Sequence, residues 1–138
     1  MSIVQTQTTS FKKELYQAVH NLSTDTLKIA LYTGNANLNE DTTVYTTSNE
    51  VVATGYTAGG NTLTWVTINS ADYTAYVNFA NTAWTAAITA RCALIYNVTQ
   101  GNKSIAVIDF GADKTSTTTF TITMPANTST TALIRSSN

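Results

Sequence analysis

Few residues of this chain belong to the types that carry out catalysis. The sequence holds one histidine, His20, and one cysteine, Cys92, which lies in the apolar run Cys92–Ile95. A thiol nucleophile needs a base beside it and an accessible, electropositive setting, whereas a cysteine among apolar residues packs as a small hydrophobic side chain. We therefore interpret Cys92 as a core residue. His20 follows an amphipathic segment, and we expect it at the end of a helix, where the backbone dipole favours a cation.

Metal and phosphate chemistry also lack their usual patterns. Asn39-Glu40-Asp41 is the only local acidic group, and it lacks the alternating spacing of a calcium loop. Gly101-Asn102-Lys103-Ser104 resembles the end of a phosphate-binding loop, but the position that needs the earlier glycine holds Tyr96. Asp109-Phe110-Gly111 matches a kinase tripeptide without any companion motif. We expect no catalytic residues, no metal ligands and no cofactor, and therefore a protein that is not an enzyme.

The charge and hydropathy of the chain argue against nucleic acid and membranes as partners. The chain has 138 residues, 11% of them charged, and a net charge of −1, whereas about a quarter of the residues are charged in typical domains. No field of one sign arises to attract nucleic acid, and no apolar run is long enough to span a membrane. The N-terminus shows no signal-peptide pattern, so we expect production in the cytoplasm.

Helical periodicity is strong at one place only. Phe11, Leu15, Ala18 and Val19 form one apolar stripe, which predicts a helix over residues 11–20. We expect Thr9 or Ser10 to cap its N-terminus and Asn21 to end it. The polar residues 1–10 before it are predicted to form an extended arm or to be disordered.

The remaining sequence alternates between apolar and polar residues at strand spacing. This alternation predicts strands over residues 26–32, 62–69, 73–79, 88–96, 103–110, 117–124 and 132–134. Two interpretations of residues 49–52 stay open, a turn of helix and an edge strand. The second and third strands are predicted to form a hairpin, as are the fourth and fifth. We expect a mainly β fold, an antiparallel β-sandwich or small barrel with one N-terminal helix, in a single domain over residues 11–138.

Aromatic and apolar side chains are the candidates for contacts with other proteins. Trp65 lies on an alternating strand and is expected in the core, whereas Trp84 and Tyr56 lie beside loops and turns. The apolar residues near the two ends of the chain could also contact a partner. The predicted interface residues are Ile3, Val4, Tyr56, Trp84, Leu133 and Ile134.

Four blocks of the sequence resemble a family of small β-rich virion proteins of tailed bacteriophages. They are residues 11–33 (FKKELYQAVHNLSTDTLKIALYT), 50–63 (EVVATGYTAGGNTL), 90–97 (ARCALIYN) and 107–111 (VIDFG). The resemblance implies a structural component of the particle without catalytic residues. We expect a capsid decoration, or cement, protein on the capsid surface, with the major capsid protein as partner and self-association as a trimer. A tail or neck component, and a carbohydrate- or receptor-binding module, remain the alternatives.

Overall fold

The computed structural model describes residues 2–137 and shows a mainly β fold with one short helix. Its centre is a five-stranded antiparallel sheet in the order β2-β10-β9-β3-β5. The bounds of these strands are Thr6–Gln7 (β2), Lys103–Thr115 (β10), Thr89–Asn97 (β9), Leu27–Tyr32 (β3) and Asn61–Thr62 (β5). The predicted hairpin of β9 with β10 is confirmed.

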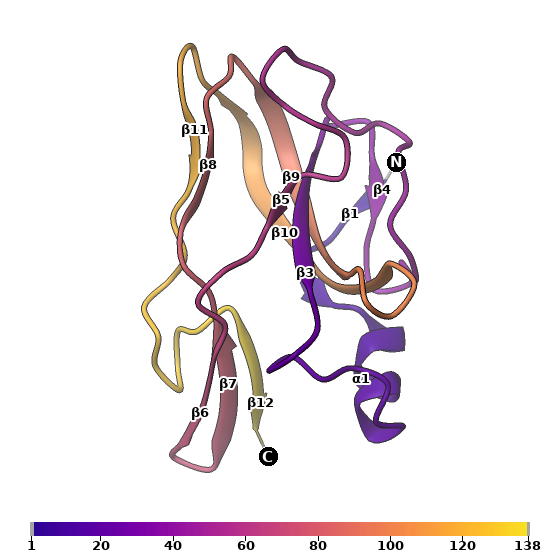
Figure 1. Ribbon diagram of the computed structural model, residues 1–138, viewed down its shortest axis with the longest axis vertical. Helices are drawn as coiled ribbons and strands as arrows, with labels where there is room; N and C mark the ends of the chain where they lie inside the picture. Colours follow the sequence, from indigo (N-terminus) through magenta and orange to yellow (C-terminus); the bar gives the residue numbers. More distant parts are fainter. Residues whose placement is uncertain (1, 138) are drawn as a thin grey trace.

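Two smaller antiparallel sheets form the second layer (Figure 1). One has the order β12-β7-β6, with bounds Ile134–Ser137, Thr74–Asn78 and Thr67–Ala71. The other pairs β11, Phe120–Ile122, with β8, Thr82–Trp84. Each sheet has open edges in the part of the chain that is described, so the architecture is a sandwich rather than a closed barrel.

The main core lies between these layers, and a second core lies on the opposite face of the central sheet. Along β3, Ile29 and Leu31 face the main core, whereas Ala30 and Tyr32 face the second one. The second core is covered by residues 34–46 and by β1, Ser2–Ile3, which pairs in parallel with β4, Asn37–Leu38. Residues 50–58 run along the edge of β3 instead, where Val51 and Tyr56 face the main core. Because the central sheet is buried on both faces, β9 is a nearly continuous apolar run rather than an alternating one.

The helix α1 spans Thr9–Tyr16, so the predicted helix over residues 11–20 was wrong at both ends. Its N-cap is Thr8, whose hydroxyl accepts the N–H of Phe11 at 3.3 Å, in place of the predicted Thr9 or Ser10. The helix ends four residues early because Ala18 takes a positive φ of 57°, and not at Asn21. Consequently His20 lies in the connection after the helix rather than at its end.

Residues 2–7 are extended as expected, but they lie on the body of the protein instead of projecting from it. Ser2 and Ile3 pair with β4, and Thr6 and Gln7 pair with the outer edge of β10. The N–H of Thr8 then donates to the carbonyl of Ile105. The segment is therefore held by backbone hydrogen bonds to its own chain.

The predicted strand over residues 62–69 is broken in the middle. Its first residues belong to β5 in the central sheet and its last to β6 in the second layer, so the chain crosses between layers at residues 63–66. At this crossing Trp65 takes a φ of 53° and leaves 63% of its surface exposed. The prediction that Trp65 is a core residue was wrong, because alternation cannot show that a strand changes sheets.

Other predicted strands are confirmed with shifted ends. Phe120, Ile122 and Met124 are buried on one face, as their alternation predicted. The last strand, β12, begins at Ile134 and not at Ala132. Residues 49–52 form neither a helix nor a strand, and Glu50 makes a single bridge with Tyr32.

Candidate functional site

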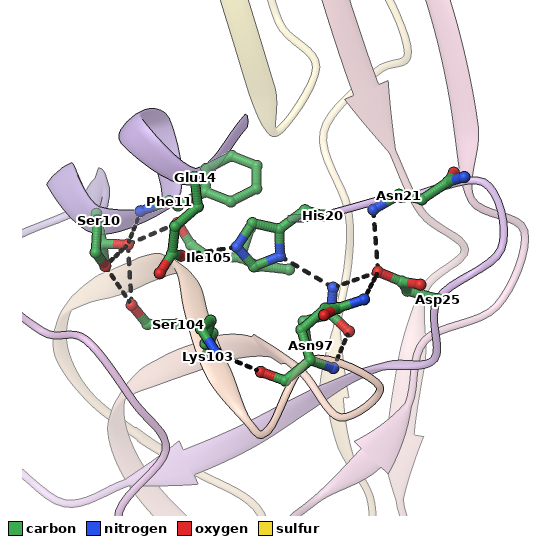
Figure 2. A network of polar contacts seen from close by, with 12 residues as sticks. Ser10, Phe11, Glu14, His20, Asn21, Asp25, Asn97, Lys103, Ser104 and Ile105 are labelled. Carbon is green, nitrogen blue, oxygen red and sulfur yellow. Dashed lines mark hydrogen bonds and ion pairs between the residues drawn. The ribbon is translucent and has the colours of Figure 1, made fainter. Parts of the chain in front are cut away.

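The candidate for chemistry with the most polar contacts is a network around His20 (Figure 2). Glu14 comes from α1, Asn97 from the end of β9, and Asp25 from the residues before β3. The ring of His20 bonds to Glu14 Oε1 through Nε2 at 2.9 Å and to Asn97 Nδ2 through Nδ1 at 3.0 Å. The ring also meets Phe11 edge to face, with 5.0 Å between ring centroids. The network thus joins the helix to the far end of the central sheet.

Asp25 fixes the direction of the hydrogen bonds in this network. Its Oδ2 accepts from Asn97 Nδ2 at 2.8 Å and from the N–H of Asn21 at 3.0 Å. Because a carboxylate only accepts, the amide nitrogen of Asn97 must face it and also donates to Nδ1 of His20. The His20 proton is then on Nε2 and donates to Glu14. Burial raises the pKa of Asp25, but the hydrogen bonds from Asn97 and Asn21 outweigh it, so the pKa is lowered overall.

A carboxylate–histidine pair can serve as a general base only when one ring nitrogen faces a substrate or nucleophile. Here both nitrogens of His20 are occupied within the protein, and the residue is 8% exposed. The arrangement is suited to fastening the helix and its following loop to the sheet. The sequence identified His20 but could not identify its partners, which lie up to 77 positions away.

A second buried polar group, the Glu50 cluster, consists of Glu50 with Tyr45, Tyr56 and Gly59. Glu50 is 7% exposed, and its carboxylate accepts from the hydroxyls of Tyr45 and Tyr56, each at 2.6 Å, and from the N–H of Gly59 at 2.8 Å. Tyr56 Oη also accepts the N–H of Leu31 at 2.9 Å. These bonds tie residues 45–59 to the central sheet. No pattern in the sequence indicated this cluster, because a single acidic residue in a loop usually faces water.

Four tyrosine hydroxyls around this cluster are held in their protonated form. Burial, and then the negative charge of Glu50, raise the pKa of Tyr96 to about 12. The same causes raise the pKa values of Tyr32, Tyr45 and Tyr56 well above the ordinary range of a tyrosine. Tyr45 and Tyr56 donate their protons to the Glu50 carboxylate, whereas Tyr32 donates to the carbonyl of Thr46 and Tyr96 to that of Gly59.

Cys92 lies in the second core with no exposed surface, as expected from the sequence. Burial first, and then the charge of Asp109, raise the pKa of its thiol to about 12. Such a thiol is a poor nucleophile. Among residues 2–137 no group of three or more His, Cys, Asp or Glu side chains is arranged to hold a metal ion. Within the same range no helix is long and apolar enough to cross a membrane.

The six predicted interface residues are not brought together on one surface. Tyr56, Trp84 and Ile134 are buried in the main core with at most 8% exposure. They are therefore inaccessible to a partner in this fold, and Trp84 packs against Tyr56 and Phe120. Trp84 is buried because its side chain faces the main core between the two layers of strands.

The other three predicted interface residues come from separate places. Val4 is 40% exposed beside β1. Ile3 is partly buried against the second core, and Leu133 is partly buried against the main core. The sequence missed the apolar side chains with the greatest exposure, which are Val52 (98%), Tyr73 (95%), Tyr16 (93%) and Trp65 (63%).

Comparison of the chain with protein-family models, with curated proteins and with solved structures finds no match. The resemblance to phage virion proteins therefore rests on the sequence blocks alone.

Proposed function

We propose that this chain is a structural virion protein of a tailed bacteriophage, a capsid decoration protein that binds the major capsid protein on the outer shell. The observation that carries the proposal is the set of exposed apolar side chains in a chain with few charged residues. Tyr16, Val52 and Tyr73 are each more than 90% exposed in a chain with 11% charged residues. Protein interfaces are depleted in charged residues at their centres and use aromatic side chains as anchors. The phage assignment comes from the sequence resemblance.

A preformed surface supports this function. Residues 2–7 are paired to the body, and the loops that cover the second core are fixed by the Glu50 cluster. A surface that is already ordered loses little conformational entropy on binding. On a symmetric shell, contacts that are weak one by one gain from effective concentration when several copies are linked.

The surface that we assign to the shell is the outer layer, defined as residues 2–4 and 34–46. This layer covers the face of the central sheet opposite the second layer of strands (Figure 1). It exposes two valines, Val4 and Val44, at 40% and 48%. Burying a valine stabilises a complex by about 1.5–3 kcal/mol when the whole side chain leaves water. Val4 and Val44 provide an apolar contact on this layer, beside the exposed carboxylates of Glu40 and Asp41.

The test is to add purified protein to capsids that lack it and to measure binding stoichiometry and the temperature at which the shell ruptures. Saturation at on the order of hundreds of copies, with a raised rupture temperature, supports a decoration protein. Val44→Asp is expected to weaken binding, because a charge would be buried against the shell. Thr118→Asp, at an exposed position between β10 and β11, is the matched control and is expected to bind normally.

The alternatives give different results in the same experiment. A tail or neck component would saturate at the copy number of a ring and leave the rupture temperature unchanged. A carbohydrate-binding module would show hits on a glycan array and no binding to the shell. Either result would contradict the proposal.

A further inference from the structure

The strand β6 forms a free edge of the second layer. It is hydrogen-bonded on one side to β7, and the order β12-β7-β6 leaves its other side without a neighbour among the described residues. Its residues are exposed from Ile68 to Ala71. Exposed edges are usually protected by lysine, proline or a bulge, since their free backbone groups can pair with another chain. Thr67–Ala71 contains none of these devices.

The β6–β7 turn determines which backbone groups face outward. The turn has two residues, Asp72 and Tyr73, both with positive φ, and it joins the paired residues Ala71 and Thr74. In such a hairpin the residues next to the turn exchange both backbone hydrogen bonds, and the exchange recurs at every second pair. Ala71, Asn69 and Thr67 therefore bond to β7. The N–H and C=O groups of Ile68 and Ser70 are directed to the free edge.

Two exposed aromatic residues flank this edge in strained backbone conformations. Trp65 (φ 53°, 63% exposed) precedes β6, and Tyr73 (φ 63°, 95% exposed) follows it. A bulky residue with positive φ is an outlier, and such strain is concentrated at functional sites. Both positions would be more easily occupied by glycine or asparagine. The strain places a large aromatic side chain in solvent at each end of the same strand.

We propose that β6 binds the β6 strand of a second copy of this chain in an antiparallel, two-fold symmetric pair centred on Asn69. In this register Ile68 of each copy lies opposite Ser70 of the other. The N–H of each of these residues then donates to the C=O of its partner, so all four outward backbone groups of each copy are hydrogen-bonded. The antiparallel direction also brings the end of one strand that carries Trp65 to the end of the other that carries Tyr73. The strained aromatics then become partners, and the two three-stranded sheets become one continuous sheet.

The chemistry of the edge favours a second copy as the occupant. An isologous interface must be complementary to itself, so like charges must not meet across it. The segment from Trp65 to Tyr73 contains one charged residue, Asp72, and the antiparallel direction keeps the Asp72 residues of the two copies at opposite ends of the paired strands. Ile68 adds an apolar side chain that is 47% exposed. This dimer replaces the expected trimer, and it does not depend on the capsid proposal.

A cysteine placed at the two-fold axis tests the register directly. Asn69 would face Asn69 of the second copy as a non-hydrogen-bonded pair, with Cα atoms about 4.5 Å apart, which a disulfide can bridge. Asn69→Cys is therefore expected to cross-link into a dimer under mild oxidation. Ala71→Cys is equally on the exposed edge, but its two copies would be about 13 Å apart and should remain uncross-linked. Cys92 is buried, so the unsubstituted chain gives the background.

Solution mass provides the second measurement. Sedimentation equilibrium of the unsubstituted chain is expected to give twice the chain mass of 14.8 kDa. Trp65→Ala combined with Tyr73→Ala is expected to weaken the dimer by about tenfold or more. A mass equal to one chain at all concentrations, or to three chains, would overturn the proposal. So would equal cross-linking of the two cysteine variants, or none with Asn69→Cys, if circular dichroism shows both to be folded.

Discussion

Replacing Tyr56 by phenylalanine tests whether the Glu50 cluster holds the outer layer on the central sheet. The substitution keeps the ring in the main core and removes only the hydroxyl. That hydroxyl donates to Glu50 Oε2 at 2.6 Å and accepts the N–H of Leu31 at 2.9 Å. Phenylalanine at this position therefore breaks two hydrogen bonds in a buried setting and leaves a backbone donor of β3 without a partner.

The cost follows from these two losses. A hydrogen bond to a charged group contributes about 1.5–3 kcal/mol, and a buried donor left unpaired costs about 1–3 kcal/mol. We expect Tyr56→Phe to lower the free energy of unfolding by about 3–5 kcal/mol, a large share of the stability of a typical domain. The measurement is urea-induced unfolding followed by tryptophan fluorescence, with amide exchange of Leu31 as a local probe.

Tyr45→Phe is the matched control. Tyr45 makes one hydrogen bond, to Glu50 Oε1, and is only partly buried, so water can replace its hydroxyl. We expect a loss of about 1–1.5 kcal/mol. If Tyr56→Phe costs no more than Tyr45→Phe, or if exchange of Leu31 is unchanged, the carboxylate and its tyrosines do not anchor the outer layer, and the reasoning is wrong.

Three further predictions concern pH and packing. The free energy of unfolding is expected to fall as the pH rises above 10, the ordinary tyrosine pKa, because the unfolded chain loses tyrosine protons that the folded chain keeps. Tyr96, whose pKa is about 12, contributes a loss of up to about 1.4 kcal/mol per pH unit until that pH. A free energy of unfolding that stays constant between pH 10 and 12 would contradict this. Gly60→Ala should prevent stable folding, because a Cβ atom would lie 1.8 Å from the carbonyl oxygen of Ile29. At Gly111 a Cβ atom meets open space, so Gly111→Ala should cost only about 1–2 kcal/mol for its positive φ. Equal thermal stability of the two variants would refute the clash at Gly60. Trp84→Ala should lower the free energy of unfolding in urea by about 3–5 kcal/mol, because Trp84 is buried. Trp65→Ala should lower it by less than about 0.5 kcal/mol at concentrations where the chain is monomeric, because Trp65 is largely exposed. The reverse order would mean that Trp65, and not Trp84, packs in the core.

The sequence by itself determined the fold class and most of the strands. Alternation along residues 120–124 and the apolar runs of β9 and β10 predicted strands, because a side chain that leaves water must follow the period of the backbone. The burial of Cys92 followed from its apolar neighbours. The scarcity of charge and of catalytic residue types followed from composition alone.

Only the tertiary structure decided which aromatic residues are accessible. The sequence placed Trp65 on an alternating strand and Trp84 beside a loop, yet Trp65 is exposed where the chain changes sheets and Trp84 faces the main core. Glu50 and His20 acquired their partners through contacts between distant segments, which a local pattern does not encode. The free edge of β6 likewise follows from strand order, because sequence periodicity shows which residues form strands but not which strand is left without a neighbour.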